Sequence, residues 1–233
     1  MNLQYPCLQP FYKDVFDETM SDPVIAREIE FVWGFVEDWM GEFLHPVGND
    51  LYHANQSESI LYCYMASQSL TFDWLSHALL LGNYETVLRE LRSILENLFF
   101  MFHLDTHHKN KTVKDKYEIL EQLEVSNRSP HGKVVFENSG YSDWKPCYDL
   151  YKELCRYIHV HTEASGKFAL KIATEGFPEA LDVEYYQGSF LQCSKTWYEI
   201  SKIAGSLVEN LFQKLQIDMR QFNPNLFTEI YGA

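Results

Sequence analysis

The sequence predicts an all-α fold, an antiparallel bundle of about five long helices. Apolar residues recur at helical spacing over several long segments, whereas no segment alternates between apolar and polar residues over the length of a strand. Residues that cap helices stand where these patterns begin and end. Because no linker rich in proline, glycine or serine divides the chain, we expect one helical-bundle domain over residues 1–233. It includes an aperiodic, aromatic-rich N-terminal arm (1–20) and an extended C-terminal tail (217–233).

Charge and cysteine content narrow the classes of function. The formal net charge is −14, from 33 acidic and 19 basic residues, so the surface repels phosphate backbones on average. A nucleic-acid site would need a local basic patch, and the densest is the lysine-rich segment 109–116. The 5 cysteines are scattered and form no Cys-x-x-Cys pair, which is typical of a reducing compartment. With neither a signal-peptide pattern nor an apolar run of about 20 residues, we expect a cytoplasmic protein with no membrane partner.

The first two long helices begin at capping residues. Ser21 and Asp22 can cap a helix whose first residue is Pro23, where the missing N–H costs nothing. Ser57 can cap a second helix that runs to about residue 81. This second helix is apolar on most sides, which predicts deep burial of its large side chains, Trp74 included.

The next helix, over residues 84–107, has the strongest pattern. Gly82 and Asn83 end the helix before it, because both residue types tolerate the left-handed cap conformation. One broad face of the 84–107 helix is apolar throughout and holds Val87, Leu88, Leu91, Ile94, Leu95, Leu98, Met101 and Phe102. We therefore expect this helix at the centre of the core.

In the second half of the chain, the sequence predicts three more helices and one long loop. Residues 111–124 form a shorter, charged helix. Residues 126–145 carry Ser-Pro, His-Gly and Ser-Gly dipeptides and predict a long surface loop. Amphipathic helices follow over 146–163 and 189–215.

A polar stripe runs along one side of the 84–107 helix. Within an arc of roughly 60° lie Arg89, Arg92, Glu96, His103 and His107. One interpretation is a solvated face with an Arg92–Glu96 pair at i,i+4, which contributes a few tenths of a kcal/mol. The other places the stripe against the 146–163 helix. Its arginines would then suit a phosphate or carboxylate ligand, with Arg89, Arg92 and Glu96 as ligand-binding residues.

The 146–163 helix carries one arginine and two histidines near its end. His161 falls on the packed face and His159 at its edge, whereas Arg156 lies about 140° from His161. An imidazole on the packed face needs a hydrogen-bond partner. His161 is then either a core histidine stabilised by the helix dipole or a functional residue that titrates near neutral pH.

The succession of Arg156, His159 and His161 resembles the Arg–apolar–x3–His pattern of the HEPN superfamily. Arg92 and Glu96 match the Arg-x-x-x-Glu helix that precedes it in similar prokaryotic helical proteins. The resemblance spans roughly residues 60–215 and implies an all-α bundle, usually a homodimer, in a defence or stress system. It also implies a metal-independent RNase or a protein that binds a nucleotide or phosphate ligand, with no cofactor. Arg156 would contact phosphate, and His161, beside His159, would act as the acid/base that activates a ribose 2′-hydroxyl.

Two other functions fit the sequence. The first is a non-catalytic interaction or scaffold protein with a protein partner, whose histidines are structural. The second is a metal-binding bundle, because His103 and His107 at i,i+4 could chelate zinc, iron or nickel with a third histidine such as His77 or His159. Histidines near a helix end are also expected without metal, and we assign no metal ligand. The common phosphate-binding and hydrolase loop motifs are absent from the sequence.

Overall fold

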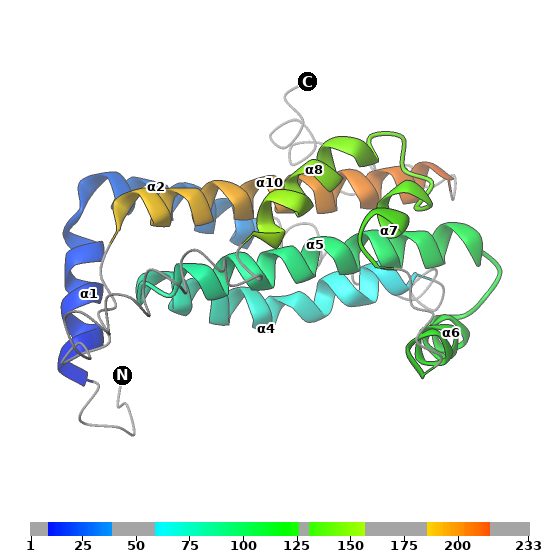
Figure 1. Cartoon of the computed structure of the whole chain (residues 1–233), viewed down its shortest axis with the longest axis horizontal. Helices are drawn as coiled ribbons and strands as arrows, with labels where there is room; N and C mark the ends of the chain where they lie inside the picture. The colour runs from blue at the N-terminus through cyan, green and yellow to red at the C-terminus, as the bar shows by residue number, and fades with distance from the viewer. Residues whose placement is uncertain (1–8, 39–58, 126–130, 157–185, 215–233) are drawn as a thin grey trace, which may run out of the picture.

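The computed structural model describes residues 9–38, 59–125, 131–156 and 186–214. Every regular element in these ranges is a helix, which confirms the all-α prediction for this part of the chain (Figure 1). The predicted tail (217–233) lies outside the described residues. The helices are, in chain order, α1 (Gln9–Ser21), α2 (Pro23–Asp38), α4 (Ile60–Leu80), α5 (Tyr84–His107), α6 (Val113–Val125), α7 (Lys133–Glu137), α8 (Trp144–Cys155) and α10 (Gln187–Lys214).

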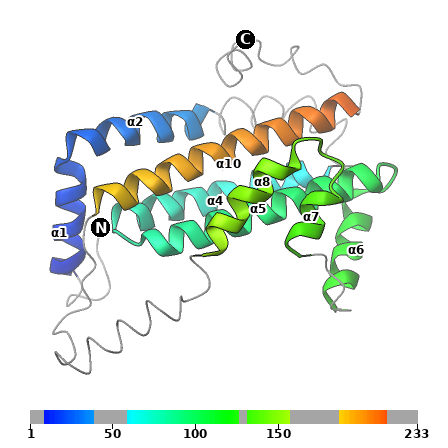
Figure 2. The ribbon, with the colours of Figure 1, turned by 45° about the horizontal axis from the view of Figure 1, so that its top comes forward.

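Three long helices form the body of the molecule. α5 packs against both α4 and α10, and the three run alongside one another (Figure 1). α2 packs along α10, and α1 turns away from it at one end of the body (Figure 2). α7 and α8 pack on α5 and on each other, while α6 contacts α4. The short helices α7 and α8 therefore meet α5 on a side that α4 and α10 leave open.

The core confirms the central place of α5. Every apolar residue predicted for its inner face is buried. From the neighbouring helices, Phe72 of α4 stacks on Trp197 of α10 with ring centroids 5.5 Å apart, and Phe136 of α7 packs on Phe99 of α5 at 4.5 Å. Fully burying one large apolar side chain contributes about 1.5–3 kcal/mol, so these contacts dominate the stability of the fold.

Two predicted helix ends are confirmed by their hydrogen bonds. Asp22 caps α2, and its Oδ1 accepts from the backbone N–H of Val24 at 2.8 Å. Gly82, at φ +75°, follows α4, and the N–H of Asn83 donates to the carbonyl of Ala78 at 2.9 Å. This is the Schellman arrangement, in which a left-handed glycine lets the chain turn sharply. It joins α4 to α5 with a tight turn.

A buried ion pair links α5, α6 and the start of α4. Lys116 Nζ lies 2.9 Å from Asp105 Oδ1, and both side chains are almost completely buried. Asp105 also accepts from the backbone N–H groups of Ile60 and Leu61 and from the hydroxyl of Ser59. Lys116 belongs to the lysine-rich segment predicted as a basic patch, so that prediction is wrong for this lysine. Its charge is neutralised inside the core.

Two segments predicted to be irregular contain helices. α1 lies within the arm (1–20), with Val15 and Thr19 buried one turn apart. α7 lies within the predicted surface loop, with Val135 and Phe136 buried. Each helix buries only a short apolar stripe, which is too little for a periodic pattern to stand out in the sequence.

The apolar helix α4 differs from its prediction in two details. Its N-cap is Ser59, whose hydroxyl accepts from the N–H of Tyr62 at 3.1 Å, and the predicted cap Ser57 lies outside the described residues. Trp74 is 47% exposed, so α4 is not buried on all sides. In the described part of the chain, no helix combines the length and apolarity needed to cross a bilayer.

Candidate functional site

α5 and α8 meet through a polar network centred on Glu96. Arg92 Nη2 lies 3.0 Å from Glu96 Oε2 and donates a hydrogen bond to the hydroxyl of Tyr151 on α8. The Tyr151 hydroxyl donates in turn to Glu96 Oε1 at 3.1 Å. The Arg92 guanidinium carbon lies 4.8 Å from the centroid of the Tyr151 ring. The Arg92–Glu96 pair therefore contacts α8, as one of the two interpretations of the polar stripe requires.

Glu96 also fixes the turn before α7. The backbone N–H of Gly132 donates to Glu96 Oε1 at 2.8 Å, and Gly132 has a φ of +59°. Three of the roughly four acceptor positions of the carboxylate are thus filled, from α5, α8 and this turn. Glu96 is well placed to orient Arg92 and poorly placed to act as a general base.

The network sets the charges of its members. Burial lowers the pKa of Arg92, but hydrogen bonds to Cys155 and Tyr151 and the charge of Glu96 outweigh burial and raise it. Burial raises the pKa of Tyr151 and the charge of Glu96 adds to the rise, although the hydrogen bond from Arg92 opposes it. At neutral pH Arg92 is a fixed cation and Tyr151 an uncharged hydroxyl.

Arg92 of α5 reaches the end of α8, where a second arginine follows in the chain. Arg92 contacts the thiol of Cys155, and the exposed Arg156 follows directly as the C-cap of α8. Arg89 lies one turn before Arg92 on α5 and is also exposed. The Nε of Arg92 is buried and has no hydrogen-bond partner within the described ranges. Among the predicted site residues, the fold thus brings Arg92 and Glu96 into contact. Arg89 precedes Arg92 by one turn on α5, and Arg156 follows Cys155 in the chain.

The two predicted acid/base residues, His159 and His161, lie outside the described residues. α8 is described to Cys155, where the backbone N–H of Arg156 donates to the carbonyl of Glu153 at 3.1 Å. The remainder of the predicted 146–163 helix, and with it the spacing of Arg156 and His161, stays a prediction.

The rings of His103 and His107 pack on one another in a tilted arrangement, with centroids 4.0 Å apart. His103 Nδ1 lies 2.7 Å from the carbonyl oxygen of Asn138, and His107 Nδ1 lies 2.9 Å from that of His103. No group of three potential metal ligands forms among the residues with described positions, so His77 does not complete the suggested triad. His103 thus connects the end of α5 to the segment after α7, whereas His107 contacts a carbonyl of its own helix.

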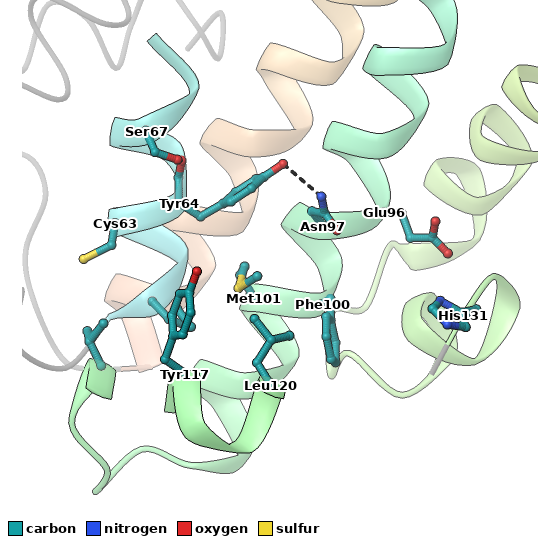
Figure 3. A pocket seen from close by; sticks show the side chains of 12 residues that line it. Cys63, Tyr64, Ser67, Glu96, Asn97, Phe100, Met101, Tyr117, Leu120 and His131 are labelled. Carbon is teal, nitrogen blue, oxygen red and sulfur yellow. Dashed lines mark hydrogen bonds between the residues drawn. The ribbon is translucent and has the colours of Figure 1, made fainter. Parts of the chain in front are cut away.

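A cavity of about 470 Å³ opens between α4, α5 and α6. Apolar side chains form most of its lining, and Figure 3 shows Tyr64 of α4 pointing toward Asn97 of α5, whose Nδ2 donates to the Tyr64 hydroxyl at 3.3 Å. Glu96 and His131 line one end, so the cavity and the polar network share Glu96. The full lining is Ile60, Cys63, Tyr64, Ser67, Glu96, Asn97, Phe100, Met101, Val113, Tyr117, Leu120 and His131.

The sequence interpretation omitted Tyr151, Gly132 and the Tyr64–Asn97 pair from the site. For Tyr151 a signal exists, because it falls on the packed face of its helix and a buried tyrosine hydroxyl requires a partner. The partner itself, Glu96, is 55 residues away in the chain, and no local pattern could identify it. The same holds for Asn97, which is 33 residues from Tyr64.

Comparison with known proteins finds no matching family model, no similar curated protein and no similar solved structure.

Proposed function

We propose that this chain is a HEPN-like antiparallel helical bundle that binds the phosphate of an RNA or nucleotide where α8 ends. The observation that carries the proposal is the contact of Arg92 with Tyr151 and Cys155. This contact brings Arg92 to the end of α8, which Arg156 caps, in a chain whose net charge is −14. An exposed arginine gives an otherwise acidic surface a local positive charge, which attracts an anionic ligand.

The arginines have different parts in this proposal. Arg92 is oriented by the Tyr151 ring and neutralised by Glu96, so it positions the site. Arg156 and Arg89 are exposed and supply the charge that meets phosphate. A guanidinium can donate two parallel hydrogen bonds to one phosphate, which gives direction as well as affinity. We assign the principal phosphate contact to Arg156.

The catalytic part of the proposal follows from the HEPN resemblance. His161 takes the proton of a ribose 2′-hydroxyl, and the oxygen attacks the adjacent phosphorus. The bond from phosphorus to the 5′-oxygen breaks, and His159 supplies the proton that this leaving oxygen takes up. Arg156 stabilises the charge on the phosphoryl oxygens. No metal takes part, and two copies of the chain form the working homodimer.

Binding is tested by fluorescence anisotropy with a labelled single-stranded RNA. Arg156→Ala should weaken binding about tenfold, the effect of losing one charge-assisted hydrogen-bond pair. Arg27→Ala is the matched control, because Arg27 is an exposed arginine on α2, which packs on α1 and α10. Equal affinities of the two variants, or no binding by the unaltered chain, would refute the phosphate site.

Cleavage is tested separately, in the presence of EDTA. The unaltered chain should cleave the RNA, and His161→Ala should bind the RNA with unchanged affinity without cleaving it. Binding without cleavage by the unaltered chain would reject the RNase activity and leave the phosphate-binding function standing.

A second candidate, a non-catalytic interaction protein, is favoured by a different observation. Exposed apolar side chains gather on α1 and α2, where Phe16, Met20, Val24 and Phe31 are each 39% exposed or more. Such a surface suits a protein partner. If this candidate is right, Arg156→Ala has no effect in any binding assay, whereas Phe31→Glu abolishes the association of the chain with its protein partner.

A further inference from the structure

We propose that the cavity between α4, α5 and α6 binds a planar, uncharged small molecule with an amide edge, that is, an N–H donor beside a C=O acceptor. This cavity shares Glu96 with the polar network but contains none of the arginines assigned to phosphate, so it would be a second site beyond the proposed function. Three properties of the cavity indicate this ligand. They are its size and apolar lining, the Tyr64–Asn97 pair in its wall, and the pairing of the Glu96 charge with Arg92.

Size and lining select a small aromatic molecule. A volume of about 470 Å³ lies within the range of ligand sites in proteins. Phe100, Met101 and Leu120 contribute apolar surface, and Tyr117, which is 55% exposed, stands at the rim (Figure 3). Aromatic rings on two sides of a cavity favour a flat ligand, because rings gain from offset or edge-on contact.

The polar pair selects an amide edge. Asn97 uses one N–H of its amide to donate to the Tyr64 hydroxyl. Its second N–H and its carbonyl oxygen have no partner within the described part of the chain. A side-chain amide with both groups open is complementary to a ligand that presents a C=O beside an N–H. Burial raises the pKa of Tyr64 to about 12, so its hydroxyl keeps a proton to donate.

The charge balance selects an uncharged ligand. Glu96 is the carboxylate at the cavity's end, and its charge is already paired with Arg92 at 3.0 Å. A cationic ligand would compete with Arg92 for this carboxylate, and an anionic ligand would be repelled by it. A neutral molecule meets neither penalty.

The test compares two probes of nearly equal shape by isothermal titration calorimetry. 1-Naphthamide carries both the N–H and the C=O, whereas 1-acetylnaphthalene keeps the C=O and replaces the NH2 group with methyl. The unaltered chain should bind 1-naphthamide about tenfold more tightly, the effect of one matched neutral hydrogen bond. Asn97→Leu should reduce the preference to less than about twofold, while Asn110→Leu, at an exposed turn, should leave it unchanged.

A second variant covers a folding failure of Asn97→Leu. Asn97→Asp keeps the size of the side chain and an oxygen that accepts from the ligand's N–H, but it cannot donate to the carbonyl that both probes carry. Both probes should therefore bind this variant more weakly, while the preference for 1-naphthamide remains. The proposal is overturned if neither probe binds, if both bind equally to the unaltered chain, if the preference survives Asn97→Leu, or if Asn97→Asp leaves the affinities for both probes unchanged.

Discussion

The Tyr151 hydroxyl donates to Glu96 Oε1 at 3.1 Å and so joins α8 to α5. The same carboxylate accepts from the Gly132 N–H and pairs with Arg92, so one side chain determines how three segments meet. Glu96 also lines the cavity between α4, α5 and α6. The account therefore predicts that changes at Glu96 affect the structure well beyond α5.

Glu96→Gln removes the charge but keeps an oxygen acceptor. Arg92, whose side chain is 22% exposed, then loses its ionic partner, and we expect the free energy of unfolding to fall by about 1–2 kcal/mol. Glu137→Gln is the control, because its pair with Lys133 is about half exposed and should contribute less than about 0.5 kcal/mol. Urea unfolding monitored by circular dichroism measures both. Equal losses in the two variants would contradict the role of Glu96.

Lys116→Met tests the buried ion pair. It leaves the Asp105 carboxylate buried without its cation, and the expected loss is about 3–5 kcal/mol. Lys133→Met breaks an exposed pair and should change stability by less than about 1 kcal/mol. Thermal and urea unfolding measure the two losses. If Lys116→Met is no more harmful than its control, the ion pair does not hold α6 in place.

Gly132→Ala tests the turn that Glu96 holds. At φ +59° an added Cβ is strained, and we expect a loss of about 1–2 kcal/mol. Gly188→Ala, in the first turn of α10, has no atom within 4 Å of the added Cβ and should be neutral or slightly stabilising. A neutral Gly132→Ala in urea unfolding would mean that the turn adopts another conformation.

Stability should decline as the solution becomes acidic. Burial lowers the pKa of His103 and of His108 below the ordinary value of 6.5, with the carbonyl of Asn138 opposing the shift at His103. Below about pH 6.5 the unfolded chain therefore binds more protons than the folded chain. The free energy of unfolding falls as the pH is lowered from there to the folded-state pKa values. Replacing both histidines with glutamine should flatten this part of the profile. If the free energy of unfolding of the double variant depends on pH as steeply as that of the unaltered chain, other groups cause the dependence.

The sequence predicted the long helices well because each has a broad apolar face. The bounds of α5 match the prediction. Gly82 was predicted from its residue type to end α4, and it has the positive φ that such an end requires. α7 was missed because its 5 residues span little more than one helical turn. Lys116 was placed at the surface because its partner, Asp105, is brought to it by the chain reversal between α5 and α6. Local patterns report periodicity and caps, whereas burial of a charge depends on distant partners.

In the candidate site, too, one part could be predicted from the sequence and another part depends on tertiary packing. The Arg92–Glu96 pair is visible as an i,i+4 spacing on one helix. Its contact with Tyr151 depends on how α8 packs on α5, which no spacing specifies. The polar stripe therefore identified α5 as the helix that carries the Arg92–Glu96 pair, whereas its partner Tyr151 became apparent only from the tertiary structure.

The salt dependence of RNA binding measures whether Arg156 neutralises a phosphate. Each phosphate contact to a single strand contributes about 0.7 to the slope of log K against log salt concentration. Arg156→Ala should reduce the magnitude of this slope by about 0.7, and Arg27→Ala should leave it unchanged. A slope for Arg156→Ala equal to that of the unaltered chain would contradict this phosphate contact.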